Sequence, residues 1–517
     1  MISISEETKT TLRQAYPEFE EACHAFFRQE LPASKYKGIS GKFGSYAERG
    51  GKSGMVRMRF SGGLITKKQI QFLAEALEKY HVSLVHFTTG QAIQYHKLSG
   101  DDILSLYHEC FDQDIYCAGG GGDNPRNVTA SPLRGVDPHE FFDISPYVDA
   151  AASYAISLIP QLHLPRKYKI GLSNGSDNEG HATFKDLGFL AKKNGTFDVY
   201  AAGGLGASNP RLGIKVAENV DPTKILYYID AFAQVFMKYG DYTNRAKARS
   251  RFMPTNLGDD EFRRVFQTYL KQSEEKDLDI TPAATVIDKK ASSSAVPNNP
   301  RIQRQKQANL YYVSYHPLTG TPNRDVFLHL LQYLSTVDSA EIRLNSDETL
   351  YAINLTAEEA EKVAAITADD TAHNNFEKSV CCIGASICQQ GLRNSHAMLT
   401  HTIQLLREKN VDTSLLPQMH VSGCPSSCGT HQVGAIGLRG AAKKIGDTMQ
   451  PAFAVFVGGT YVATQEHLGT QVGVITENNI PEFLTQLAGV LQKADQPFTT
   501  WYPAHHEEFA ALVNAIE

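Results

Sequence analysis

Apolar and polar positions follow a pattern that occurs twice along the chain. Residues 55–98 and 312–355 align without a gap at a constant offset of 257, so that Leu73 meets Leu330. In both segments the apolar runs, glycines and helical spacing predict strand, turn, amphipathic helix, strand, turn and strand. Chance agreement over a short apolar pattern is the alternative interpretation.

Individual elements are predicted from residue type and spacing. Residues 56–60 and 84–87 carry the β-branched and aromatic side chains that are typical of strands. A helix is predicted over 222–239, where apolar residues recur at helical spacing. These residues are Ile225, Leu226, Ile229, Phe232 and Phe236. Aromatic-rich helices of this kind usually belong to a core, and we expect the same here.

Each repeat leads into a loop with unusual chemistry. The first is followed by four glycines, Gly119 to Gly122, and the second by a cysteine-rich loop that begins at Cys381. In both halves a helical stretch comes next and is followed by a short strand. The predicted strands are 168–172 and 419–422. We therefore predict an α+β fold of two pseudo-twofold-related halves, in which ferredoxin-like repeat subdomains accompany mixed sheets with flanking helices. Functional loops should meet between the halves, because domain interfaces favour cofactor pockets.

A polar stretch with a Ser-rich segment separates the halves and is typical of an exposed connector. The expected order is an N-terminal extension (1–54), a first ferredoxin-like half-repeat (55–110), a first cofactor- and substrate-binding half (111–270), a linker (271–307), a second ferredoxin-like half-repeat (308–370) and a metal- and cofactor-binding half (371–517).

Composition and charge exclude several classes. The chain has 517 residues and a net charge of −6, without a run of basic residues, which argues against nucleic acid as a partner. No apolar stretch approaches the length of a membrane span, so no membrane association is expected. The N-terminus is polar and acidic rather than basic and apolar, which favours a cytoplasmic location.

Five of the eight cysteines lie between residues 381 and 428. Five residues separate Cys382 from Cys388 and three separate Cys424 from Cys428, in loops rich in glycine and serine. Four such thiolates suffice for a [4Fe–4S] cluster. Structural zinc is the alternative, although its sites usually pair cysteines at shorter spacing, and unliganded core thiols are a third possibility.

With these cysteines the chain resembles the siroheme-containing nitrite/sulfite reductase family. The most specific match is the segment from His420 to Gly429, and the likeness extends over roughly residues 35–500. The resemblance implies that Cys382, Cys388, Cys424 and Cys428 bind the cluster. It also implies that Cys428 bridges to the iron of siroheme.

The resemblance further implies a cationic pocket for a small anion. Arg57, Arg126, Lys167 and Lys169 fall on the family's active-site motifs. Arginines can hold oxygens through forked donors, and lysines can act as point charges and acids. A solvated surface charge is the ordinary alternative for each of them, and their joint occurrence at matching positions favours the pocket.

Cofactor contacts are expected from Arg59, Gln91, Gln94 and Asn127, by the same resemblance. One departure concerns the family's Thr-Thr-Arg-Gln, which reads Thr-Thr-Gly-Gln here, with Gly90 in place of an arginine that holds the macrocycle. A basic segment is also similar to the family's, although a solvated helix face explains it equally well. Its residues are Arg245, Arg249 and Arg251.

The implied activity is six-electron reduction of sulfite to sulfide, or of nitrite to ammonia, by an oxidoreductase. Lys169 favours sulfite, because plant-type nitrite reductases of the family have asparagine at that position. No dinucleotide-binding motif is present, so the electrons should come from a ferredoxin or a separate reductase subunit. A structural zinc protein and an iron–sulfur protein without siroheme are the rival classes.

Overall fold

The computed structural model describes residues 4–283, 287, 289 and 297–516. The chain divides into two compact units. The first contains 1–204, 208–315 and 323–369, and the second contains 205–207, 316–322 and 370–517. The expected linker, 271–307, includes positions outside the described residues, and its described ends hold the last residues of one helix and a short strand.

The first unit begins with three helices and a strand. These are α1 (Glu6–Gln14), α2 (Tyr16–Phe27), α3 (Ala33–Ser40) and β1 (Ser45–Ala47). Strand β1 pairs with the first strand of the first repeat, so this segment is part of the repeat's sheet rather than an appendage.

The two repeats have matching elements. The first consists of β2 (Gly54–Arg59), β3 (Leu64–Ile65), α4 (Lys67–Lys79), β4 (Leu84–Phe87), β5 (Ala92–Leu98) and α5 (Gly100–Asp112). The second consists of β11 (Ile302–Arg304), β12 (Tyr311–Tyr315), α10 (Arg324–Thr336), β13 (Glu341–Leu344), β14 (Leu350–Leu355) and α11 (Ala357–Ile366). Helices α4 and α10, and strands β4 and β13, agree at both ends with the offset of 257 that the sequence predicts.

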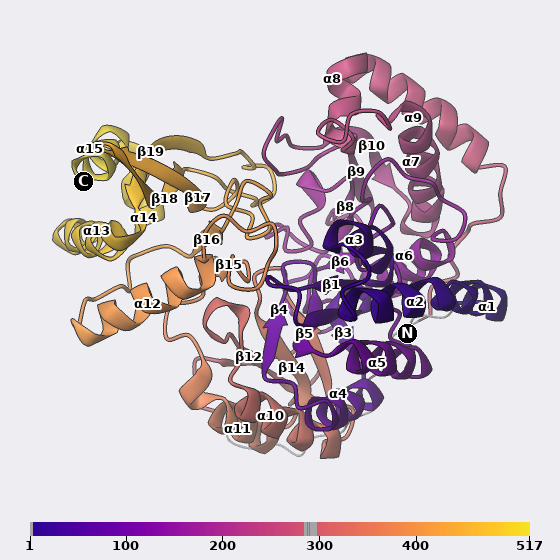
Figure 1. Cartoon of the computed structure of the whole chain (residues 1–517), viewed down its shortest axis with the longest axis horizontal. Coiled ribbons are helices and arrows are strands. Elements are labelled where there is room, and N and C mark those ends of the chain that lie inside the picture. Colours follow the sequence, from indigo (N-terminus) through magenta and orange to yellow (C-terminus); the bar gives the residue numbers. More distant parts are fainter. Residues whose placement is uncertain (1–3, 284–286, 288, 290–296, 517) are drawn as a thin grey trace. The chain divides into compact units, whose positions relative to one another are not determined.

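Helices α4 and α10 pack against each other along the repeat sheets (Figure 1). Their facing leucines, Leu73 and Leu330, are fully buried, and each such burial stabilises the fold by roughly 1.5–3 kcal/mol. Strand β3 of the first repeat pairs with β13 of the second. The first repeat keeps its own sheet, β1–β2–β5–β4, and lends β3 to the sheet of the second repeat, β11–β12–β14–β13–β3. The two repeats share one hydrophobic core.

A third sheet completes the first unit. Its strands are β6 (Thr129–Ala130), β7 (Ile170–Ser173), β8 (Leu187–Ala191), β9 (Phe197–Ala201) and β10 (Ile214–Val220), and its helices are α6 (Ser145–Ser157), α7 (Ile225–Tyr239), α8 (Met253–Leu257) and α9 (Asp259–Ser273). The predicted core helix is α7, in which Ile229, Phe232 and Phe236 are fully buried. Leu226 is only partly buried.

The second unit contains a sheet with the same strand order. Its strands are β15 (Val380–Cys381), β16 (Met419–Ser422), β17 (Ile436–Ile445), β18 (Thr448–Val457) and β19 (Thr470–Thr476), and its helices are α12 (Ser395–Glu408), α13 (Ile480–Ala494), α14 (Phe498–Trp501) and α15 (His506–Ala515). In both sheets the first three strands, β6–β8 and β15–β17, are parallel and the last two are antiparallel. The predicted α+β class with duplicated sheets is confirmed. Within the described ranges, no helix is long and apolar enough to cross a bilayer.

Candidate functional site

The cysteine loops leave neighbouring parallel strands of the second unit. Cys382 directly follows β15, and the loop that contains Cys424 follows β16. The carboxyl ends of parallel strands lie at one edge of a sheet, so both loops start at the same edge. The backbone N–H of Gly423 donates to Cys382 Sγ at 3.1 Å, which joins the two loops directly.

The four predicted ligands interact with one another electrostatically. Burial, and then the charge of Cys428, raises the pKa of Cys382 to about 12. Burial also raises the pKa of Cys388, with further contributions from Cys428 and Cys424. Cys381 is different, because its side chain is packed in the hydrophobic core of the unit and its Sγ donates to the carbonyl oxygen of Cys382. The geometry therefore favours Cys382, rather than Cys381, as the ligand.

The donor set fits an iron–sulfur cluster. A [4Fe–4S] cluster takes each cysteine on a different iron, so its ligands need not converge on a single ion. Among the described side chains, no three of His, Cys, Asp or Glu type are close enough to share one metal ion. Ser427 lies between Cys424 and Cys428, and its buried Oγ has no hydrogen-bond partner in the described structure. A cluster sulfur would give this hydroxyl an acceptor.

In the first unit, Arg57 and Arg126 converge on the glycine loop. Arg57 Nη1 and Arg126 Nη1 donate to the same carbonyl oxygen, that of Gly120, at 2.8 and 3.0 Å. Arg126 Nη2 also donates to the carbonyl oxygen of Gly122. In the described part of the chain no carboxylate forms an ion pair with either guanidinium, and Arg126 Nε is buried without a partner. Two positive charges are thus held together by carbonyl oxygens.

Arg59 stabilises the loop that carries Arg126. It is 3% exposed, and it donates to the carbonyl oxygens of Ala118, Pro125 and Arg126. Burial lowers the pKa of Arg59 to about 9, with a further decrease from the charge of Arg126. Arg59 therefore fixes the loop that carries Arg126, and its contact with the cofactor stays a prediction.

The three polar candidates also make protein contacts. Gln91 is fully buried, and its amide exchanges hydrogen bonds with the backbone of Ala130 in β6. Asn127 donates to the carbonyl oxygens of Gly90 and Gln91. With its amide oxygen turned toward Arg57, Gln94 accepts from Nε and Nη2 of that residue at 3.2 and 2.8 Å. All three position the neighbouring loops and Arg57.

Lys167 and Lys169 precede β7 and are half-buried. They are two residues apart in extended chain, so they share a face. The backbone N–H of Lys169 donates to the buried carboxylate of Asp186 at 2.8 Å, and Arg249 pairs with the same carboxylate at 3.2 Å. Arg251 is 4% exposed and lies in a 3₁₀ turn. A solvated helix face is therefore wrong for Arg249, which pairs with Asp186, and for Arg251, whose Nε donates to the carbonyl oxygen of Ser208 at 2.9 Å. Arg245 is exposed and pairs with Asp123.

We define the basic cluster of the first unit as seven side chains that are linked by electrostatic interactions. They are Arg57, Arg126, Arg166, Lys169, Lys185, Arg249 and Arg251. Sequence reasoning missed Lys185 and Asp186. Their signal was a charged pair immediately before the apolar run 187–191, which is an unusual place for a buried lysine.

Gly90 lies in the turn between β4 and β5. A Cβ added to it would meet only Thr88 Oγ1, at 3.6 Å. The turn therefore has space for a side chain at position 90, and no steric barrier explains why glycine stands there instead of arginine. The arginines of the basic cluster fit the carboxylates of siroheme and could replace this anchor. In the described structure, Arg126 and Arg249 each have a buried Nε without a hydrogen-bond partner.

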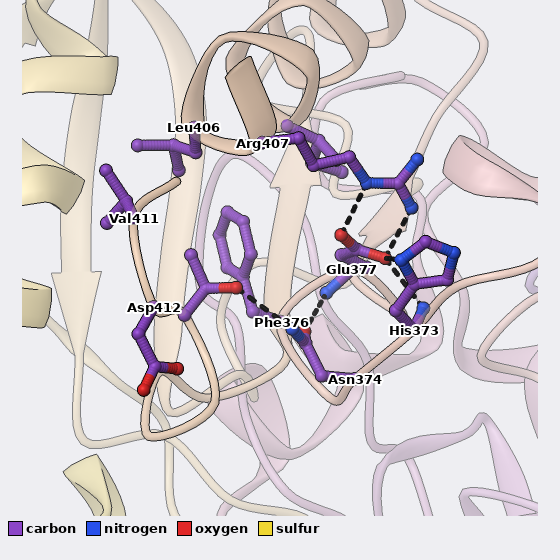
Figure 2. A pocket seen from close by; sticks show the side chains of 10 residues that line it. His373, Asn374, Phe376, Glu377, Leu406, Arg407, Val411 and Asp412 are labelled. Atoms are coloured by element: carbon purple, nitrogen blue, oxygen red, sulfur yellow. Dashed lines mark hydrogen bonds and ion pairs between the residues drawn. The ribbon is translucent and has the colours of Figure 1, made fainter. Parts of the chain in front are cut away.

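A separate pocket of the second unit lies beside the end of α12 (Figure 2). Glu377 accepts from Arg407 Nε and Nη2 at 2.7 and 2.6 Å and from the backbone N–H of His373 at 2.6 Å. Asn374 Nδ2 donates a hydrogen bond to Thr413 Oγ1 at 2.9 Å. These polar groups satisfy one another, and none of the sequence-predicted site residues lines this pocket.

Comparisons with known proteins agree with the two repeated modules. The family model described as "Nitrite/Sulfite reductase ferredoxin-like half domain" matches residues 46–110, and "Nitrite and sulphite reductase 4Fe-4S domain" matches residues 121–274. The second match contains no cysteine. The sheet of the second unit has the same strand order and carries the clustered cysteines instead.

Several curated proteins are similar over most of their length. Ferredoxin–nitrite reductase of Synechococcus elongatus is 27% identical over 84% of this chain and 85% of its own. The assimilatory ferredoxin-dependent nitrite reductase of Haloferax mediterranei is 24% identical over 81% and 76%, and the chloroplastic ferredoxin–nitrite reductase of Zea mays is 26% identical over 80% and 74%. The solved structure of the Mycobacterium tuberculosis NirA protein has the same fold, with a TM-score of 0.75 and 20% identity over 91% of this chain and 92% of that one.

Proposed function

The chain belongs to the nitrite and sulfite reductase family, and on that premise we propose that it catalyses the six-electron reduction of nitrite to ammonia. Membership implies a [4Fe–4S] cluster and siroheme as the cofactors. Relatives of this chain are named for nitrite and for ferredoxin, which supports nitrite as the substrate and a ferredoxin as the electron donor.

The observation that carries the proposal is the basic cluster. Arg57 and Arg126 share a carbonyl oxygen as acceptor and have no carboxylate partner in the described structure. Their charges therefore remain available to a small anion, and such preorganised donors are worth most where water is excluded. Lys167 and Lys169 are half-buried and flank Tyr168, whose carbonyl oxygen accepts from the backbone N–H of Arg126 at 2.8 Å. They can hold protons for the oxygens that leave as water.

The cofactors would be held by residues of known placement. Cys382, Cys388, Cys424 and Cys428 would bind the cluster, and the arginines of the basic cluster would pair with siroheme carboxylates. When bound, the two groups supply an iron site for the anion and a relay for single electrons. Arg59, Gln91, Gln94 and Asn127 act one step away, by fixing the loops on which the charged residues stand.

Sulfite is the second candidate substrate, because Lys169 resembles the residue of sulfite reductases. The test is anaerobic reconstitution of the full chain, followed by a visible spectrum, iron and acid-labile sulfide analysis, and reduced-viologen assays with each anion. We expect tetrapyrrole bands, cluster iron, and ammonia or sulfide as product. For any variant that removes an arginine of the basic cluster, Arg263→Gln is the matched control, because it removes an exposed arginine that pairs with Asp260.

Three outcomes would contradict the proposal. A colourless protein with one zinc ion indicates a structural site. Cluster absorption without tetrapyrrole bands indicates an iron–sulfur protein of another kind. A protein that holds both cofactors and reduces neither anion overturns the activity itself.

A further inference from the structure

Lys185 is a buried lysine that the mechanism above does not use. It lies in the loop before β8 and is 6% exposed. A Cβ added to Gly171 would meet Lys185 Cγ at 3.0 Å, so the lysine stem lies across β7 at that glycine. Gly171 and Lys169 are two residues apart in extended chain and share a face of the strand. Lys185 therefore extends over the face from which the Lys169 side chain leaves.

The charges around Lys185 are mostly of its own sign. Lys169 lies in the extended segment directly before β7, Arg249 lies in the turn before the 3₁₀ helix 250–252, and Asp186 is the next residue in the chain. The carboxylate of Asp186 is already engaged by Arg249, by the hydroxyl of Ser250 and by the backbone N–H of Lys169.

No described carboxylate is within ion-pair distance of Lys185 Nζ, and the nearest ring is Phe184 at 5.9 Å. Burial, followed by the charge of Lys169, lowers the pKa of Lys185 well below its ordinary value. Arg249 adds to this decrease and Asp186 opposes it. The surroundings of Lys185 thus disfavour its ammonium form.

We propose that Lys185 is the proton-uptake residue of the anion site, uncharged when the site is empty and an ammonium group when nitrite or sulfite is bound beside Lys169. The inference rests on the proposed function, since it takes the anion from there. An anion supplies the countercharge that Lys185 lacks, and a nearby opposite charge favours the protonated form. One of the protons that reduction consumes would then enter together with the substrate.

The first test is proton uptake during anion binding. The oxidised holoenzyme is mixed with nitrite, and separately with sulfite, in weakly buffered solution at pH 7.5 with an indicator dye. We expect uptake of about one proton per site in the wild type and close to none in Lys185→Met or Lys185→Arg, because neither variant side chain can change its charge in this range. Lys193→Met, which removes an exposed lysine nearby, should behave as the wild type.

The second test needs no activity and no anion. A lysine whose folded pKa is lowered destabilises the fold at low pH, and this cost disappears as pH rises toward the unfolded value near 10.4. The melting temperature of the Lys185→Met holoenzyme should therefore exceed that of the wild type most at pH 6 and least near pH 10. The Lys193→Met control should show no such slope.

The outcomes separate this inference from the activity on which it rests. A holoenzyme that reduces neither anion overturns the proposed function. A wild type that reduces either anion, with the same proton uptake in Lys185→Met, overturns the role of Lys185 alone. A melting difference that does not change with pH also counts against it, because a purely structural lysine would give that result.

Discussion

Glu179 in the first unit takes the loop position that Cys428 takes in the second. Each follows a residue with left-handed backbone, Asn178 at φ 50° and Ser427 at φ 55°, and each precedes a glycine. In both loops a Cβ on that glycine would stand about 2 Å from a carbonyl oxygen of the preceding strand, at 1.9 and 2.0 Å. One loop geometry thus carries a carboxylate in one unit and a thiol in the other.

Cluster content should depend on Cys382 and not on its neighbour. We expect Cys382→Ala to lower bound iron and acid-labile sulfide by more than about half, because one of four thiolate ligands is lost. Cys381→Ala is the matched control, since it removes a thiol that lies in the hydrophobic core. Elemental analysis of both variants, reconstituted in parallel, measures the difference. Equal iron in the two variants would count against the ligand assignment.

Glu179 should make stability depend on pH. Burial, followed by the charges of Asp347 and Asp177, raises the pKa of Glu179 to about 8 from an ordinary value of 4.5. The stability contributed by the neutral acid is complete below 4.5 and is lost as pH rises to about 8. Glu179→Gln should therefore melt above the wild type by an amount that grows over this range and then levels off. A constant difference from pH 5 to pH 9 would contradict the shift.

Gln94 should act on the substrate through Arg57. Its amide oxygen accepts two hydrogen bonds from that guanidinium, so Gln94→Leu frees the arginine to adopt other rotamers. We expect kcat/KM for nitrite to fall at least on the order of tenfold, with unchanged iron content, since each of the two charge-assisted bonds that are lost is worth about 1.5 kcal/mol. Gln94→Glu keeps an acceptor at the same place but puts a carboxylate on Arg57, so it should not restore the activity, because it cancels the charge that the anion needs. A loss of cofactor together with activity would instead indicate the direct cofactor contact.

Lys169 should influence the choice between anions. Lys169→Asn removes a charge beside Asp186 and Lys185. We expect the ratio of kcat/KM for sulfite to that for nitrite to fall several-fold, because the sulfite dianion gains more from each cation than the nitrite monoanion does. Steady-state assays with one reduced-viologen donor measure this ratio. An unchanged ratio would remove Lys169 as a selector.

Gly90 should tolerate the arginine found in most of the family. The open space at its Cβ position predicts that Gly90→Arg folds normally. The new cation should slow the loss of siroheme during gel filtration in high salt, relative to both the wild type and Gly90→Ala. Retention of the Soret band through repeated passages measures this. Faster loss in the arginine variant would show that the turn cannot direct a side chain toward the macrocycle.

The sequence was informative where local patterns determine structure. The gapless offset of 257 between the repeats holds at both ends of the pairs α4 and α10, and β4 and β13, because helical periodicity and short turns are local properties. The spacing of the cysteines identified both loops for the same reason. Strand β7 begins at Ile170 rather than at Tyr168, an ordinary end effect.

What the sequence did not provide were side-chain partners from distant segments. The sequence did not indicate that Gln94 and Gln91 bind Arg57 and Ala130, which lie 37 and 39 positions away. Arg249 was equally compatible with a solvated helix until Asp186, 63 positions away, was placed beside it. Such pairings depend on how β7, β8 and the following turns come together, and no local pattern encodes them.

The way in which Arg59 is bonded has a consequence for any assay of this protein. Carbonyl oxygens of Ala118, Pro125 and Arg126 satisfy its hydrogen bonds without cancelling its charge, and the same holds for Arg57 and Arg126 at Gly120. Chloride or phosphate in the buffer should therefore compete with the substrate for this positive region. Apparent affinities for nitrite and sulfite become comparable only when both are measured in the same electrolyte at the same concentration.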